Sequence, residues 1–195
     1  MTAVPEWMCP PRPDGWYADD LDQLSQAPRH TELIDGVLVL RLSREEAWHG
    51  RVVSALLLAL AAQAPAGIEV ERERTIRLDE RTRVEPDLLA ARPARHGPDR
   101  RFYVPDQVLL AIEVASPESA HRDRTVKLRK YAEAGIAHYW RVEEDDAGLP
   151  VVHAYELDEP TRSYAPSGVH RRAICTKTPF PIELVLDKLM AGRRS

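Results

Sequence analysis

Two acidic residues stand at or beside apolar runs that are suited to form strands, and this placement constrains the fold more than any other feature. Asp87 immediately precedes Leu88, Leu89 and Ala90, and Glu113 lies within the run 108–114. A carboxylate inside an apolar strand is costly unless a partner compensates its charge. A divalent cation is one such partner, because Mg²⁺ binds one or two carboxylates and keeps several of its waters.

Length and composition favour one globular domain inside the cell. The chain has 195 residues, enough to bury a core, and a net charge of −4, which argues against a general coating of DNA but not against a local basic surface. Only Cys9 and Cys175 are present, so a disulfide framework and a cysteine-rich zinc site are excluded. We see no signal peptide, and the longest apolar stretch, 55–62, is too short to span a membrane. We therefore expect a cytoplasmic protein.

The hydrophobic pattern predicts helices and strands in an α+β (mixed α/β) order. In the first half we expect an irregular arm over 1–15 and a short helix over 19–24 that packs through Leu21 and Leu24. A hairpin over 31–42 should turn at Asp35-Gly36. A helix should follow a capping box at Ser43 and Glu46 and end near 64–67, before one or two antiparallel strands over 68–78. In the second half we expect the Asp87 and Glu113 strands, separated by a loop over 92–105, and then a helix over 120–134 that ends at Gly135. Further strands should cover 137–143, 151–157 and 164–176, with a turn over 145–148. A short strand or helix should cover 182–190.

Several short motifs follow one another with a recognisable spacing. They are Glu32 in TELIDG, Asp87 after Pro86, Glu113-Val114 before Ser116-Pro117, and Asp123, Lys127 and Tyr131 before Gly135 and Tyr139-Trp140. From about residue 16 to the C-terminus, this set resembles the Uma-two family of restriction endonucleases, which belongs to the PD-(D/E)XK nuclease fold. The resemblance implies one nuclease-like domain over 16–195, with a restriction-endonuclease-like central mixed sheet flanked by helices, an N-terminal hairpin and C-terminal antiparallel strands.

The resemblance also implies roles for four side chains. Asp87 matches the PD aspartate, Glu113 the second acid and Glu32 the N-terminal glutamate of the family. The lysine expected two residues after Glu113 is absent, since Ala115 stands there. Lys127, on the following helix, takes its place by resemblance.

By the same resemblance, we expect a metal-dependent endonuclease that hydrolyses phosphodiester bonds, with DNA as the substrate and Mg²⁺ or Mn²⁺ as the cofactor. Asp87, Glu113 and the backbone carbonyl of Val114 would hold the ion, which activates water and polarises the phosphate. Lys127 would supply positive charge near the attacking water or the phosphate. Glu32 would hold a metal-bound water or a second ion.

Each of these residues also has an ordinary structural interpretation, and both interpretations stand at this point. Asp87 can end a turn, Glu113 or Glu32 can pair with an arginine, and Lys127 can be a solvated helix lysine. Other candidates favour structural roles: His49 would pack or cap near the site, Ser116 and Ser119 would cap a helix, and His121 and His138 lack metal-ligand spacing with a partner.

Basic residues in two segments are candidates for contacts with phosphate or for a solvated charged face. They are Arg92, Arg95, His96, Arg100 and Arg101 in the loop, and Arg122, Arg124, Arg129 and Lys130 in the helix. A homodimer suits the nuclease hypothesis, because cutting both strands of a duplex needs two sites. The alternative function is a catalytically silent nuclease-fold module for nucleic-acid binding or protein assembly.

The metal hypothesis makes two geometric predictions. Asp87 and Glu113 should lie on neighbouring strands with their carboxylates about 4–5 Å apart, close enough to share one ion. At about 100° per residue, Lys127 lies at the border of the helix face that packs on the sheet, whereas Lys130 should point to solvent. The stem of Lys127 can then run along apolar surface and bring its ammonium to Glu113.

Overall fold

A six-stranded mixed sheet forms the centre of the fold in the computed structural model, which describes residues 5–41, 46–93, 101–116 and 122–190. In spatial order its strands are β10 (Ser163–His170), β9 (Pro150–Asp158), β8 (His138–Glu144), β7 (Val108–Val114), β6 (Leu88–Ala91) and β3 (Glu69–Arg72). Neighbours are antiparallel except for β7 and β8, which are parallel. The expected α+β class with a mixed central sheet is therefore confirmed.

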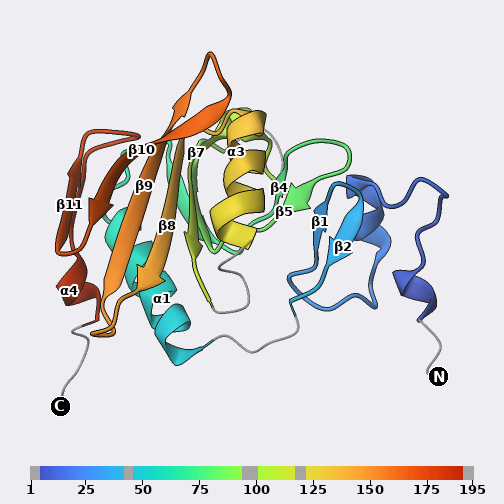
Figure 1. The fold of residues 1–195 in the computed structure, drawn as a ribbon, viewed down its shortest axis with the longest axis horizontal. Coiled ribbons are helices and arrows are strands. Elements are labelled where there is room, and N and C mark those ends of the chain that lie inside the picture. Colours follow the sequence, from blue (N-terminus) through green and yellow to red (C-terminus); the bar gives the residue numbers. More distant parts are fainter. Residues whose placement is uncertain (1–4, 42–45, 94–100, 117–121, 191–195) are drawn as a thin grey trace.

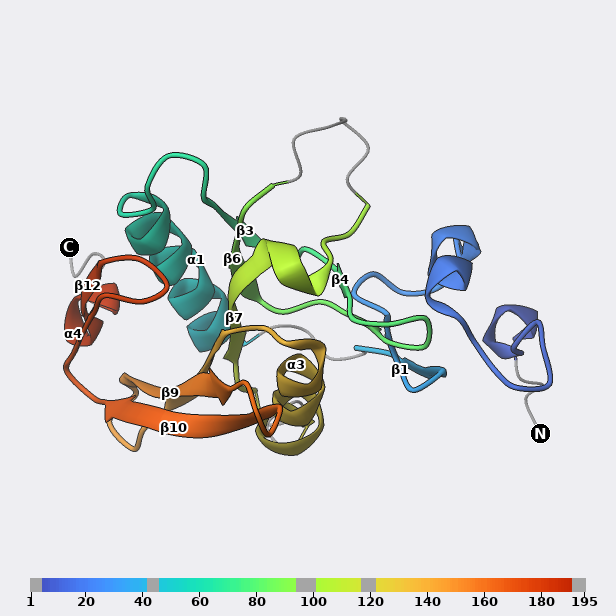
Figure 2. The ribbon, with the colours of Figure 1, turned by 90° about the horizontal axis from the view of Figure 1, so that it is seen from above.

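Helices cover both faces of this sheet (Figures 1 and 2). On one face lies α1 (Ala47–Ala61), whose buried residues Val52, Leu56 and Leu60 recur every four positions and form an apolar stripe. On the other face lies α3 (Leu128–Ala134), which continues from the π-helical turn η4 (Asp123–Lys127). Gly135 ends α3 in the left-handed conformation, with φ of 89°, as the sequence predicts.

Because both faces are covered, β6 and β7 read as continuous apolar runs rather than alternating ones. Leu88, Leu110 and Ile112 pack into the core beneath α1, whereas Leu89 and Ala111 pack into the core beneath α3. Side chains alternate along a strand, so Glu113 follows Ala111 on the α3 face. The fold thereby points a carboxylate of β7 toward the helix that carries Lys127.

A second sheet lies beside the central one and carries the N-terminal hairpin (Figure 1). Its strands, in spatial order, are β2 (Val37–Val39), β1 (Glu32–Ile34), β5 (Arg83–Val84) and β4 (Ile76–Arg77). The β1–β2 turn has positive φ at both Asp35 and Gly36, the geometry of the two-residue turn that the sequence predicts. The turns η1 (Glu6–Met8) and η2 (Ala18–Gln23) precede it, and Leu21 and Leu24 pack as expected around Trp16.

The C-terminal residues extend the core beneath α1. The strand pair β11 (Ala173–Thr176) and β12 (Ile182–Val185) is followed by α4 (Leu186–Leu189), and Ile174, Ile182 and Leu186 join the α1 core. The single strand expected over 164–176 is two strands, β10 and β11, because the chain turns at 171–172. The segment 182–190 contains both a strand and a helix rather than one of them.

One other local expectation is corrected. The N-cap of α1 is Glu46 and makes no side-chain cap hydrogen bond, so a capping box with Ser43 at the N-cap is wrong; Ser43 itself lies outside the described residues. The segment 68–78 forms two antiparallel strands, as the sequence allows; β3 and β4 lie in different sheets because Glu73, with φ of 51°, redirects the chain between them. Part of the expected 92–105 loop lies outside the described residues, and the last residue of this loop begins the turn η3 (Pro105–Gln107). The expected 120–134 helix is described only from residue 122.

Among the residues that the structure describes, no helix is long and apolar enough to cross a membrane.

The α1 stripe provides a test of the core. Leu56 is 0% exposed and Leu58 is 72% exposed on the same helix. Leu56→Ala should lower the free energy of unfolding by about 2–5 kcal/mol, because it removes buried methyl groups and leaves a cavity. Leu58→Ala, the matched control, should change it by less than about 0.5 kcal/mol. Urea unfolding measures both, and equal losses would contradict the placement of α1.

Candidate functional site

Asp87 and Glu113 lie at the same end of two adjacent strands. In the antiparallel β6–β7 pair Leu88 is opposite Ile112, so the next pair toward that end is Asp87, just before β6, and Glu113 of β7. The two residues are 3% and 1% exposed. Glu113 lies in β7 and Asp87 lies directly before the neighbouring strand β6, next to the placement that the sequence predicts, whereas the carboxylate separation of about 4–5 Å stays a prediction.

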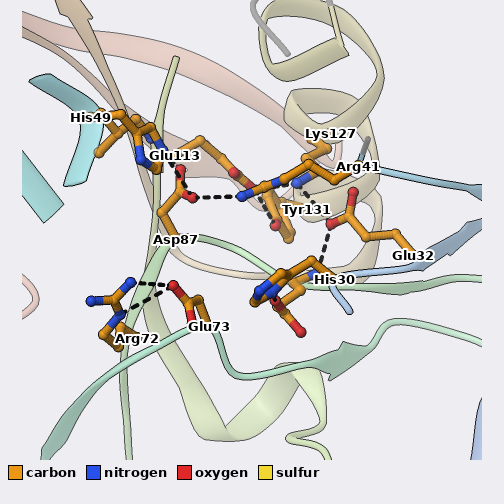
Figure 3. A network of polar contacts seen from close by, with 12 residues as sticks. His30, Glu32, Arg41, His49, Arg72, Glu73, Asp87, Glu113, Lys127 and Tyr131 are labelled. Carbon is orange, nitrogen blue, oxygen red and sulfur yellow. Dashed lines mark hydrogen bonds and ion pairs between the residues drawn. The ribbon is translucent and has the colours of Figure 1, made fainter. Parts of the chain in front are cut away.

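Asp87 is held by groups from three segments of the chain (Figure 3). The backbone N–H of Val114 donates to Asp87 Oδ2 at 2.7 Å, while His49 Nε2 and Arg41 Nη1 lie 3.2 Å and 3.4 Å from Oδ1. Burial alone would raise the pKa of Asp87, but His49, Arg41 and the Val114 amide outweigh it and lower that pKa. Asp87 is therefore an ionised carboxylate whose Oδ1 faces cationic or donor side chains.

Glu113 is held by two donors from the helix layer. Lys127 Nζ and Tyr131 Oη donate to Glu113 Oε1 at 2.8 Å and 2.7 Å. Burial first, and then the charges of Glu113 and Glu32, raises the pKa of Tyr131 well above its ordinary value. The Tyr131 hydroxyl thus stays protonated and fixes the orientation of the Glu113 carboxylate.

Lys127 joins the two sheets through a buried ammonium. Its Nζ lies 2.8 Å from Glu32 Oε1 and 2.8 Å from Glu113 Oε1, and the residue is 1% exposed. Glu32, in β1, also accepts a hydrogen bond from the backbone N–H of Glu85 at 2.7 Å. Lys127 is the last residue of the π-helical turn η4, a feature that occurs frequently at functional sites.

The expectation for Lys130 is wrong. Its side chain is only 11% exposed and its ammonium pairs with Asp35, in the β1–β2 turn, instead of pointing to solvent. A helical angle places Lys130 relative to α3 alone, and it carries no information about the hairpin turn that packs against that helix. Among the described residues, the Lys130 ammonium forms ion pairs with Asp35 and Glu133 and with none of the site acids.

The structure thus brings together all five residues predicted for the site: Glu32, Asp87, Glu113, Val114 and Lys127. It also adds Arg41, which sequence reasoning missed. Burial would lower the pKa of Arg41, but the charges of Asp87, Glu113 and Glu32 raise it above its ordinary value. No sequence signal could have found it, because an arginine after a hairpin strand is commonly a surface residue.

A second pair lies beside Glu32. His30 Nδ1 contacts a carboxylate oxygen of Glu85, and Figure 3 shows His30 below Glu32 in the same view. The pKa of Glu85 is raised, first by burial and also by the charge of Glu32, although His30 acts in the opposite direction. Burial and the negative charge of Glu32 therefore both disfavour the ionised form of Glu85.

The remaining candidates lie around this centre or outside the described residues. Arg101 is exposed and lies 3.6 Å from Asp22, and Arg124 and Arg129 pair with Glu143 and Glu133. The other positions fall into three groups: Arg92 is exposed, Ser116, Arg122 and His138 are half-buried, and Arg95, His96, Arg100, Ser119 and His121 lie outside the described part of the chain.

The donor set of the site fits a hard divalent cation. Within the described ranges, no three or more His, Cys, Asp or Glu side chains form a ready-made cluster for a metal. Two buried carboxylates remain at the end of the β6–β7 pair, and Mg²⁺ takes one or two carboxylates and retains several waters. Asp87 and Glu113 match that requirement, whereas a zinc site would need three or four nitrogen, sulfur or oxygen ligands.

The buried ammonium predicts unequal stability effects for two lysines one helical turn apart. Lys127→Met leaves Glu32 and Glu113 uncompensated and should lower the free energy of unfolding by about 3–5 kcal/mol. Lys130→Met removes a contact with an exposed aspartate and should cost at most about 1 kcal/mol. Chemical denaturation without metal measures both variants, and a Lys127→Met protein as stable as Lys130→Met would contradict the buried arrangement.

Comparison with known proteins agrees with this architecture. The Uma2 family model, described as "Putative restriction endonuclease", matches residues 18–187. A crystal structure of a "putative nuclease belonging to DUF820" from Anabaena variabilis ATCC 29413 is similar in fold, with a TM-score of 0.66 and 14% sequence identity, over 88% of this chain and 97% of that one. None of the curated proteins matches the chain. The matches to this family model and to this nuclease structure support a nuclease-like function. Because the family model spans most of the sequence, the chain belongs to the Uma2 family.

Proposed function

We propose that this protein is a metal-dependent endonuclease that hydrolyses phosphodiester bonds in DNA. The observation that carries the proposal is a pair of buried carboxylates, Asp87 and Glu113, at the same end of the β6–β7 pair, with the Lys127 ammonium 2.8 Å from Glu113. Burying two acids and a lysine together is expensive for a purely structural purpose. Perturbed, mutually coupled ionisable groups are typical of functional sites.

Asp87 and Glu113 are the proposed metal ligands, with the Val114 carbonyl as a third. When bound, Mg²⁺ or Mn²⁺ supplies Lewis-acid chemistry at the phosphate and makes water a better nucleophile. The Val114 N–H fixes one oxygen of Asp87, and Tyr131 and Lys127 fix one oxygen of Glu113. Both carboxylates are thus held in place before any ligand arrives, which lowers the cost of organising the site.

Lys127 is the proposed cation that stabilises developing negative charge on the phosphate during hydrolysis. Its ammonium is buried, and charges act more strongly in such a site than in water. Glu32 also contacts the Lys127 ammonium, at 2.8 Å, and so helps to position it. We assign Glu32 to positioning Lys127 and to holding water near the scissile phosphate.

A catalytically silent module for nucleic-acid binding or assembly is the second candidate. One observation favours it: Arg41 and His49 already contact Asp87, so the protein satisfies this acid without a metal. Cytoplasmic location and a homodimer that places two sites on one duplex complete the nuclease proposal. Cleavage of DNA by the protein distinguishes the nuclease from the catalytically silent module.

A plasmid-nicking assay tests the activity. In Mg²⁺ or Mn²⁺ the protein should convert supercoiled plasmid to nicked or linear DNA, and chelation should stop it. Asp87→Ala and Lys127→Met should each lose at least about 100-fold in rate, because each removes charge stabilisation at the reacting group. Lys130→Met, which leaves the acidic site intact, should cut at nearly the wild-type rate.

The temperature of this assay must lie below the unfolding transition of every variant, since Lys127→Met is also expected to be less stable. Wild-type protein that binds DNA but never cuts it in either metal would favour the silent module. A Lys130→Met variant as inactive as Lys127→Met would overturn the assignment of the lysine.

DNA affinity should fall steeply as salt rises, because binding must depend on arginine and lysine contacts to phosphate. Arg101 is the described loop residue for testing this, with its side chain 61% exposed. Arg101→Ala should weaken binding to all sequences alike and reduce the slope of log K against log salt by about 0.9. Fluorescence polarisation measures this, with Arg162→Ala in the β9–β10 turn as the control. An unchanged slope would remove Arg101 from the contact surface.

A further inference from the structure

Arg41 lies against the same acids that the proposed reaction uses. It follows the hairpin strand β2, its side chain is 22% exposed, and its Nη1 is 3.4 Å from Asp87 Oδ1. Figure 3 shows its guanidinium reaching from the hairpin side toward Asp87, with Lys127 nearby. The charges of Glu113 and Glu32 also act on it. Arg41 is thus a cation at the place where a divalent ion would meet Asp87.

The contact between Arg41 and Asp87 is looser than the other contacts of the site acids. A distance of 3.4 Å lies beyond the usual range for a charge-assisted hydrogen bond, whereas Lys127 lies 2.8 Å from both of its glutamates. Asp87 Oδ2 is fixed separately by the Val114 N–H at 2.7 Å. Asp87 therefore keeps its orientation when Oδ1 exchanges one cation for another.

The charge balance gives this exchange a direction. Glu32, Asp87 and Glu113 contribute three negative charges, and Lys127 and Arg41 contribute two positive ones, so the group carries one negative charge with a neutral His49 and none with a protonated His49. Adding a divalent cation makes the same group positive in either case. Arg41 is then repelled from the carboxylates and attracted to an incoming anion.

We propose that Arg41 is a phosphate-binding residue of this site, held by Asp87 in the metal-free protein and transferred to the DNA phosphodiester when a divalent cation takes Asp87 Oδ1. The inference rests on the proposed function and deepens it. The planar guanidinium suits the role, because its fork of donors matches two phosphate oxygens. Arg41 contacts the substrate, whereas Lys127 stays with Glu32 and Glu113.

Metal affinity without DNA tests the first half of this exchange. Isothermal titration with Mn²⁺ should show that Arg41→Met binds about tenfold more tightly than wild type, because the ion no longer competes with a guanidinium for Asp87. The rise in melting temperature on adding Mn²⁺ should be larger in the same variant. Arg72→Met, which removes a nearby arginine paired with Glu73 instead, should match wild type. Equal or weaker Mn²⁺ binding by Arg41→Met would overturn the exchange.

DNA affinity tests the second half. With a short duplex and Ca²⁺ in place of Mg²⁺, Arg41→Met should bind about tenfold more weakly and the salt slope should fall by about 0.9, as expected for the loss of one phosphate contact. Arg162→Met, at a distant turn, should bind like wild type. A structural ion pair alone would leave the salt slope unchanged, so an unchanged slope would overturn the phosphate role.

Arg41→Lys decides the question if Arg41→Met does not fold. It keeps the charge, so Mn²⁺ affinity should stay within about twofold of wild type, while DNA affinity should fall because the fork is lost. Wild-type DNA affinity in Arg41→Lys would overturn the role of the fork. Wild-type protein that binds no metal would overturn the proposed function itself. If the wild type cuts DNA but the Arg41 variants keep its Mn²⁺ and DNA affinities, only the role of Arg41 is overturned.

Discussion

The site depends on one buried ammonium. Lys127 Nζ lies 2.8 Å from Glu32 in the hairpin sheet and 2.8 Å from Glu113 in the central sheet. Because removing one partner of such a group costs about 3–5 kcal/mol, this contact fixes how the helix and the two sheets meet. Tyr131, one turn further along the same helix, adds a second donor to Glu113. The structural role of Lys127 and its proposed chemical role therefore use the same atoms.

The acids themselves are the unfavourable part of the fold. Glu32, Asp87 and Glu113 are each at most 4% exposed, whereas the other strand residues at this level in the described part of the chain are apolar. Lys127, Arg41 and His49 compensate them without a metal, and Asp87 also uses the amide of Val114. A sequence that follows its hydrophobic pattern elsewhere and departs from it here is typical of a site kept for function rather than for stability.

Local sequence signals predicted most elements, because they depend on neighbouring residues. The apolar runs located β6 and β7, and Asp35-Gly36 located the hairpin. The motif residues Glu32, Asp87, Glu113 and Lys127 could be grouped only through a family resemblance, since separate segments bring them together. Arg41 belongs to none of those motifs, and Lys130 was misplaced because its partner, Asp35, comes from another part of the chain. Contacts between distant segments are therefore what the sequence pattern could not supply.

The central claim is that Asp87 and Glu113 share one divalent cation. Crystals soaked in Mn²⁺ and measured at its absorption edge test this claim directly, because anomalous scattering locates the ion without reference to activity. We expect one anomalous peak about 2.0–2.3 Å from an oxygen of each carboxylate, with Arg41 displaced from Asp87. A fully soaked crystal with no peak at these two acids, and with Arg41 still on Asp87, would contradict it.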